Sequence, residues 1–200
     1  MKFGKEKLTM MNKDKGVGND AIGINQKRSL IEKMFEKAEW KIARYANEAD
    51  KKAKKIYSKA EAIKLFGVPQ FTKIEGNCLC NEGINEMLTL TCGTGATQYS
   101  NANANLIVGT GTGSASATDT ESTFTSGVKK TMESGYPTYG SSQKATWKAS
   151  YGSSDANQAW NEFGVLNAAS SGKLLNRKVS SQGTKSSGQT WDLTLEITLS

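Results

Sequence analysis

The 200-residue sequence contains no histidine, which removes the commonest general base and the commonest metal ligand. A Ser–His or Cys–His nucleophile pair is excluded for the same reason. Only 2 prolines occur, against 20 glycines. No apolar run approaches the roughly 18–20 residues that a membrane-spanning helix needs. Residues 1–26 are basic and lack the apolar segment of a secretory signal, so no such signal is expected. The composition therefore points away from enzymes and membranes.

Positive charge is concentrated near the N-terminus of a chain whose formal net charge is +7. Residues 1–75 contain 18 Lys and Arg against 10 Asp and Glu, whereas residues 76–200 contain 8 against 9. A shift of this kind indicates a boundary between parts of different character. We therefore expect a flexible basic arm over residues 1–26, an amphipathic helical anchor over 27–68 and an antiparallel β domain over 77–200.

The helical anchor is predicted because apolar residues recur in steps of three and four over residues 27–66. Ser29 and Glu32 have the spacing of a capping box at its start, and Gly67 with Pro69 is a stop signal at its end. One kinked helix or two consecutive helices would satisfy this spacing. The apolar stripe is expected to form an assembly interface and consists of Ile31, Phe35, Ile42, Tyr45, Ile56 and Ile63.

From residue 101 onward the apolar period changes to two, which is typical of strands. Turn signals recur about every 8–15 residues, as in an antiparallel sandwich or small barrel. A short helix is expected over residues 81–88, and residues 174–181 and 190–199 are expected to pair as a hairpin. The predicted fold class is therefore α+β, with a long N-terminal α-helical segment followed by an antiparallel β-sandwich or small β-barrel.

The β region is poor in large aliphatic residues, since Leu, Ile, Val and Phe make up 19 of residues 76–200. We expect its core to rely on tryptophans together with Tyr151, and to be completed against a neighbouring subunit. The last strand alternates most clearly, with apolar residues on one face and Asp192 and Thr194 on the other. The expected core residues are Trp147, Trp160, Phe163, Trp191, Leu193, Leu195 and Ile197.

The cysteines are considered as a zinc site and the glycine-rich segment as a phosphate-binding loop. Cys78, Cys80 and Cys92 have no histidine to complete a zinc site and fit no common zinc spacing, so reduced thiols are expected. The glycine-rich residues 109–113 are not followed by a helical pattern, which a phosphate-binding loop requires. We expect a flexible loop at a strand end there.

Paired acids and a lysine run are the remaining candidates. Glu82 with Glu86, and Asp155 with Glu162, have the residue types of a glycosidase pair, but structural roles are favoured. We therefore predict no catalytic residue, no cofactor and no metal. Lysines between residues 51 and 59 belong to the predicted helix, along which acids are interspersed, as on a solvated helix: Glu32, Glu36, Glu39, Glu48, Asp50 and Glu61. Contact of the basic N-terminal region with nucleic acid or an acidic protein surface is the alternative, and nucleic acid is not favoured.

A pattern in the C-terminal part resembles a group of tailed-bacteriophage structural proteins over roughly residues 77–200. The motif W-N-E-h-G-h-h-N-A, where h is apolar, is followed by L-x-R and also resembles phage fibre and collar modules. Its segments are residues 159–168, 172–177, 183–185 and 188–191 with the terminal alternating strand, preceded by residues 81–85 and 105–109.

The resemblance implies a virion component without enzymatic activity, assembled in the host cytoplasm. The preferred interpretation is a capsid-associated decoration or cement protein anchored by its N-terminal region. Its expected partners are copies of itself, for example as a trimer, and the major capsid protein or other virion proteins, with no membrane. A tail, baseplate or fibre-attachment protein is the alternative. A host-surface glycan-binding module, with Trp147, Tyr151 and Trp160 as stacking platforms, is a third, and a cell-wall hydrolase is the least favoured.

Overall fold

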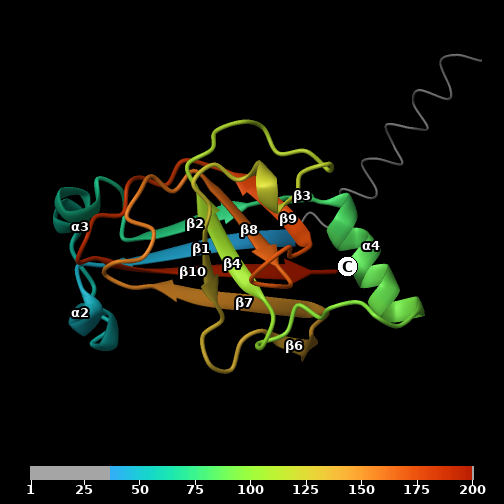
Figure 1. Ribbon diagram of the computed structural model, residues 1–200. Coiled ribbons are helices and arrows are strands. Elements are labelled where there is room, and N and C mark those ends of the chain that lie inside the picture. The colour runs from blue at the N-terminus through green and yellow to red at the C-terminus, as the bar shows by residue number, and fades with distance from the viewer. Residues whose placement is uncertain (1–36, 200) are drawn as a thin grey trace, which may run out of the picture. The chain divides into compact units, whose positions relative to one another are not determined.

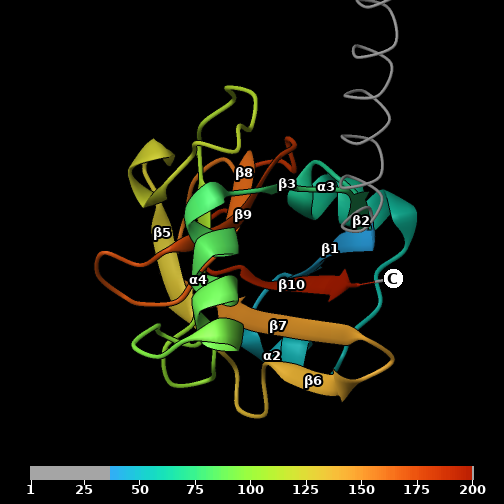
Figure 2. The same ribbon diagram turned by 90° about the vertical axis from the view of Figure 1, so that its right-hand side faces the viewer.

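The computed structural model describes residues 37–199, which form two antiparallel sheets packed face to face (Figures 1 and 2). The first sheet contains, in spatial order, β2 (Phe71–Glu75), β1 (Lys37–Tyr45), β10 (Thr190–Thr198), β7 (Lys144–Tyr151) and β6 (Thr138–Ser141). The second contains β3 (Cys78–Leu79), β9 (Leu174–Val179), β8 (Glu162–Leu166), β4 (Asn105–Gly109) and β5 (Val128–Thr131).

The predicted α+β class is wrong, because the described chain is mostly β and shows no long N-terminal helix. Within residues 37–199, α-helix is confined to α2 (Glu48–Lys52), α3 (Lys59–Phe66) and α4 (Asn81–Cys92), with a 3-10 turn at η1 (Glu121–Thr123). Figure 1 shows α2 and α3 at one end of the sandwich and α4 at the other. No helix in this range is long and apolar enough to cross a bilayer.

Strand β1 occupies part of the region that was expected to be helical. It pairs with β10 from Lys37 opposite Thr198 to Tyr45 opposite Thr190. Steps of three and four from Ala38 through Ile42 to Tyr45 suggested a helix, but Ala38, Trp40 and Ile42 also follow a period of two. Alternate side chains from Ala38 to Arg44 are buried, and the aromatic and β-branched content of the segment favours a strand.

The predicted helix stripe is therefore divided among different elements. Ile42 and Tyr45 are buried on β1, where Ile42 belongs to the core between the sheets. Ile56 lies between α2 and α3 and Ile63 lies on α3, and both are exposed. The basic arm over residues 1–26, together with Ile31 and Phe35, lies outside the described residues.

The core between the sheets is built around tryptophan rings. The Trp160 ring packs edge-on against the rings of Tyr151 and Trp191, with centroid separations of 4.9 and 5.0 Å. Trp40 of β1, which the sequence analysis left out of the core, lies 5.8 Å from Phe163 of the opposite sheet. All seven expected core residues belong to this buried cluster. The N-terminal strand thus supplies large side chains that the aliphatic-poor β region lacks.

Strands β9 and β10 do not form the expected hairpin. Strand β9 pairs with β8 and β3, whereas β10 pairs with β1 and β7 in the other sheet. The connecting residues 180–189 therefore cross between the sheets. A period of two identifies a strand but not its partner, so the loop alone suggested the wrong pairing.

Helix α4 confirms the expected short helix over residues 81–88 and continues to Cys92. Gly83 allows it to lie close to β9, since a Cβ atom there would overlap the Leu175 backbone. Glu82 in its first turn accepts a hydrogen bond from the backbone N–H of Leu174, with 2.7 Å between N and Oε1. Figure 2 looks onto this end of the sandwich.

Replacement of Leu195 by alanine should strongly destabilise the sandwich, because this β10 side chain is fully buried between the sheets. Large-to-small core changes cost about 2–5 kcal/mol of unfolding free energy. The matched control is Thr194→Ala on the opposite face of the same strand. Denaturant titrations of both variants check this, and equal unfolding free energies would contradict the assigned face.

Candidate functional site

The glutamate of the W-N-E-h-G motif is the centre of a buried ionic cluster. Glu162 on β8 is fully buried. Its Oε1 accepts hydrogen bonds from the backbone N–H groups of Gly111 and Thr125, at 2.7 and 2.8 Å. Its Oε2 accepts from Nε and Nη2 of Arg177, at 3.0 and 2.6 Å. Both carboxylate oxygens are therefore satisfied inside the protein, and the two guanidinium N–H groups that converge on Oε2 make charge-assisted hydrogen bonds.

Arg177, the arginine of the L-x-R motif, extends the cluster to the long loop between β4 and β5. Its Nη1 donates to Oδ2 of Asp119 at 2.9 Å, and the same oxygen accepts from the Ser116 backbone N–H at 2.8 Å. The facing carboxylates raise the pKa of Arg177 against the opposing effect of burial. The cluster therefore pins residues of the loop to β8 and β9.

The glycine-rich residues 109–113 have a structural role that their resemblance to a phosphate loop conceals. A Cβ atom at Gly109 or Gly111 would lie 2.5 Å from Oε1 of Glu162, which is closer than real Cβ atoms approach an oxygen. Backbone N–H groups do bind an anion here, as in a phosphate loop, but the anion is a carboxylate of the same chain. The loop lies at a strand end as expected, and it is held in place rather than free.

Two further glycines of the motif segments are required by close packing. A Cβ atom at Gly164 would lie 2.8 Å from the Asn176 carbonyl oxygen, and one at Gly172 would lie 2.6 Å from the Ala168 carbonyl oxygen. Asn167 between them is buried and donates from Nδ2 to Oε1 of Glu86 at 2.9 Å. The residue types of the W-N-E-h-G-h-h-N-A pattern are therefore required by close packing and hydrogen bonds around β8.

The segment Gly183-Thr184-Lys185 docks the crossover between the sheets against the residues before β8. The Gly183 carbonyl accepts from the Trp160 backbone N–H at 2.9 Å. Lys185 is buried and donates from Nζ to the Gly152 carbonyl at 2.6 Å and to Oδ1 of Asn157 at 2.8 Å. Burial lowers the pKa of Lys185 to about 8, since among residues 37–199 no carboxylate contacts its ammonium group directly.

The residues considered for glycan binding or glycoside hydrolysis are buried or bonded to other residues of this chain. The rings of Tyr151 and Trp160 are fully buried, so these two rings are not available as stacking platforms, and Trp147 is 7% exposed. Glu86 accepts from Asn167 and from the Thr97 backbone N–H. Asp155 instead pairs with Lys130 at 2.6 Å. The burial of two of the three rings therefore does not favour the glycan-binding interpretation based on Trp147, Tyr151 and Trp160.

The cysteines behave as buried or surface thiols. Cys80 is buried, and burial raises its pKa to about 12, which keeps it protonated. Cys92 lies exposed at the end of α4. Over residues 37–199, Cys, Asp and Glu side chains do not gather into a group of three or more that could hold a metal ion.

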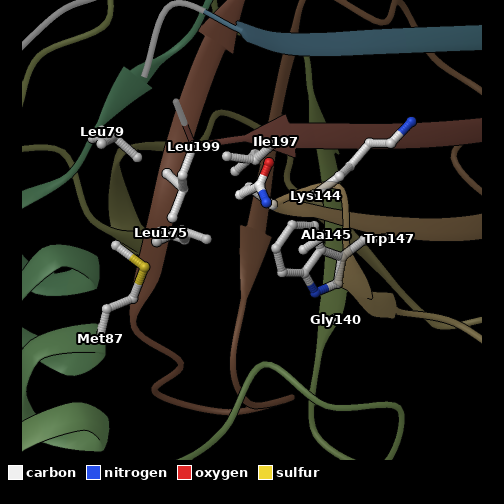
Figure 3. Close-up of a pocket in the computed structure, with 10 residues that line it drawn as sticks. Leu79, Met87, Gly140, Lys144, Ala145, Trp147, Leu175, Ile197 and Leu199 are labelled. Carbon is white, nitrogen blue, oxygen red and sulfur yellow. The ribbon is translucent and has the colours of Figure 1, made fainter. Parts of the chain in front are cut away.

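An apolar groove with a volume of about 400 Å³ opens at the α4 end of the sandwich (Figure 3). Met87 of α4 and Leu175 of β9 line one side, and Trp147 of β7 and Ile197 of β10 line the other. Lys144 is the one titratable residue among its lining. The apolar lining of the groove suits an aliphatic or aromatic group rather than a charged ligand. Sequence reasoning missed it because it joins elements distant along the chain.

No family model, no curated protein and no solved structure matches this chain. The geometry of the described residues, together with the motif resemblance, therefore carries the argument about function.

Replacement of Arg177 by methionine should cost roughly 3–5 kcal/mol of unfolding free energy, because it leaves the Glu162 charge buried without its partner. Adding Glu162→Gln should restore part of this loss, since the amide oxygen can still accept from Gly111 and Thr125. Denaturant unfolding of the single and double variants tests the coupling. Strictly additive losses would show that the two side chains do not act as a pair.

The stability contributed by Lys185 should increase with pH above about 8. The pKa of this side chain is about 8 in the folded protein against an ordinary value of 10.5, so folding opposes its charged form at neutral pH. Above pH 10.5 the side chain is neutral in both states and the cost vanishes, a change of about 3 kcal/mol. The unfolding free energy of wild type relative to Lys185→Met should therefore rise between pH 7.5 and 10. A difference that is constant over this range would contradict the burial effect.

Proposed function

We propose that this chain is a non-enzymatic structural component of a tailed-phage virion, as a capsid-associated decoration or cement protein. The β-sandwich is the displayed module, and its partners are the major capsid protein or other virion proteins and further copies of itself. The proposal joins the motif resemblance to what the motif residues do in the fold.

The observation that carries this proposal is the structural use of the motif. Its glutamate and arginine form the internal ion pair, and its tryptophan lies in the core. Four of its glycines lie where a side chain would overlap neighbouring atoms: Gly83, Gly109, Gly164 and Gly172. Residues used in this way specify a framework instead of a reaction. A resemblance carried by such residues supports a common architecture with phage structural modules, in which function is assembly.

The chemistry-bearing side chains support the same role. The carboxylates of Glu162 and Asp119 are held by Arg177, and Glu82 and Glu86 accept backbone hydrogen bonds that fix α4 and its neighbours. These carboxylates form hydrogen bonds and ion pairs within the chain. Such internal use suits a module that keeps its shape between neighbouring virion proteins.

The chain should be present in purified particles of the tailed phage that encodes it, in numbers that scale with the major capsid protein. Quantitative mass spectrometry of banded particles gives the copy number, and labelling with an antibody separates head from tail. A phage with the gene deleted, complemented in trans, provides the control. Absence of the chain from particles would overturn the proposal, and a few copies confined to the tail would replace the capsid assignment with the tail alternative.

A further inference from the structure

The end of the sandwich that carries α2 and α3 presents an aliphatic side chain among lysines. Ile56, between the two helices, is 71% exposed. Lys54 and Lys55 precede it and Lys59 follows at the start of α3, and all three are exposed. We call Ile56 with Lys54, Lys55 and Lys59 the Ile56 surface.

The backbone on both sides of Ile56 is fixed by one buried glutamine. Gln70 donates from Nε2 to the Lys55 carbonyl at 2.7 Å, and its Oε1 accepts from the Tyr57 backbone N–H at 2.9 Å. The Tyr57 hydroxyl is itself held between the Ala46 backbone N–H and Oδ2 of Asp50. Ile56 is therefore presented on a preorganised segment, which lowers the ordering cost of binding.

The start of α3 strengthens this presentation. Ser58 and Glu61 form a capping box, in which each side chain accepts from the backbone N–H of the other residue. Tyr57 before the cap packs with Ala62 and Phe66 in a small separate cluster, as in a hydrophobic staple. These contacts leave Ile56 outside the cluster and facing solvent.

The lysines here differ from Lys51, which belongs to the sheet surface. Lys51 pairs with Glu133 at 2.7 Å and with Asp192 at 2.9 Å. Within residues 37–199, Lys54 and Lys59 form no ion pair, and Lys55 contacts Asp50 only at 3.5 Å. Nearby acids are used internally: Asp50 bonds Tyr57, and Glu61 caps α3. The outward charge of this end is therefore positive.

We infer that the Ile56 surface docks onto an acidic protein surface that offers an apolar seat for Ile56. Exposed lysines complement carboxylates and speed encounter. Burial of the exposed Ile56 side chain in an apolar seat would add favourable free energy to binding. The phosphate backbone of a nucleic acid offers no such apolar seat. Under the proposed function the partner is the acidic face of a neighbouring virion protein, and this identification alone rests on that function.

The test uses the purified full chain and synthetic probes. A random copolymer of glutamate and tyrosine supplies carboxylates with apolar groups, poly-glutamate supplies carboxylates alone, and a short DNA duplex supplies phosphates. Binding is measured by fluorescence anisotropy at low salt. The test variants are Ile56→Ser and the triple Lys54→Gln/Lys55→Gln/Lys59→Gln. The matched control removes three exposed lysines from other parts of the sandwich, as Lys37→Gln/Lys73→Gln/Lys173→Gln.

The copolymer should bind more tightly than poly-glutamate. Binding should weaken about tenfold in the lysine variant and roughly fivefold in Ile56→Ser, with little change in the control. Equal binding of the two polymers, or an equal loss in the control, would overturn the inference. Tighter binding to DNA than to the copolymer, lost in the same variants, would overturn it in favour of nucleic acid.

These measurements need no particles, so their outcome is separate from that of the proposed function. A chain that binds the copolymer through Ile56 but is absent from virions retains the docking surface and loses the virion role. A chain found in virions whose lysine variant binds the copolymer as wild type does retains the role and loses this surface.

Discussion

The second sheet depends on how the fully buried carboxylate of Glu162 is accommodated. Removing a carboxylate from water costs several kcal/mol unless its oxygens are paired and hydrogen-bonded. Here Arg177 and two backbone N–H groups supply that compensation. The backbone can approach closely only because Gly109 and Gly111 lack side chains. One buried charge thus dictates an arginine on the neighbouring strand, glycines in the loop and the path of residues 110–127, which have little regular structure of their own.

The first sheet meets a different constraint, a shortage of aliphatic side chains. Strand β1 lies between β2 and β10 in this sheet and brings Trp40 and Ile42 into the core. It also carries Arg44, whose guanidinium lies 4.6 Å from the centroid of the Trp191 ring and donates to the carbonyls of Pro69 and Gln182. Burial lowers the pKa of Arg44 to about 10. The sandwich is therefore completed by a segment whose basic composition suggested a separate part.

Strands are predicted correctly where the apolar spacing fits only a strand. The prediction is wrong where the spacing fits both a helix and a strand. Strands β4 and β7 lie beyond residue 101, where the period of two predicted strands, because the apolar pattern there fits no helix. Residues 37–45 fit both periods, and tertiary pairing with β10 decided between them. The cluster around Glu162 was missed because its charges occupy inward positions where periodicity analysis looks for apolar residues. The signal available was a glutamate at the start of the apolar strand β8 and an arginine shortly after the two leucines of β9.

The lysine-rich residues 51–59 show why composition alone does not locate a surface. In the sequence they form one run of like residues, yet the fold divides them. Lys51 reaches across to Asp192 on β10 and Glu133 and joins α2 to the first sheet. Past Lys54, whose backbone has a left-handed φ of 50°, the chain turns and Gln70 holds the next residues with Ile56 outward. The charge of Lys51 is used to attach α2 to the first sheet and is unavailable to a partner protein. The lysines of residues 51–59 that can contact a partner are therefore those that follow the turn.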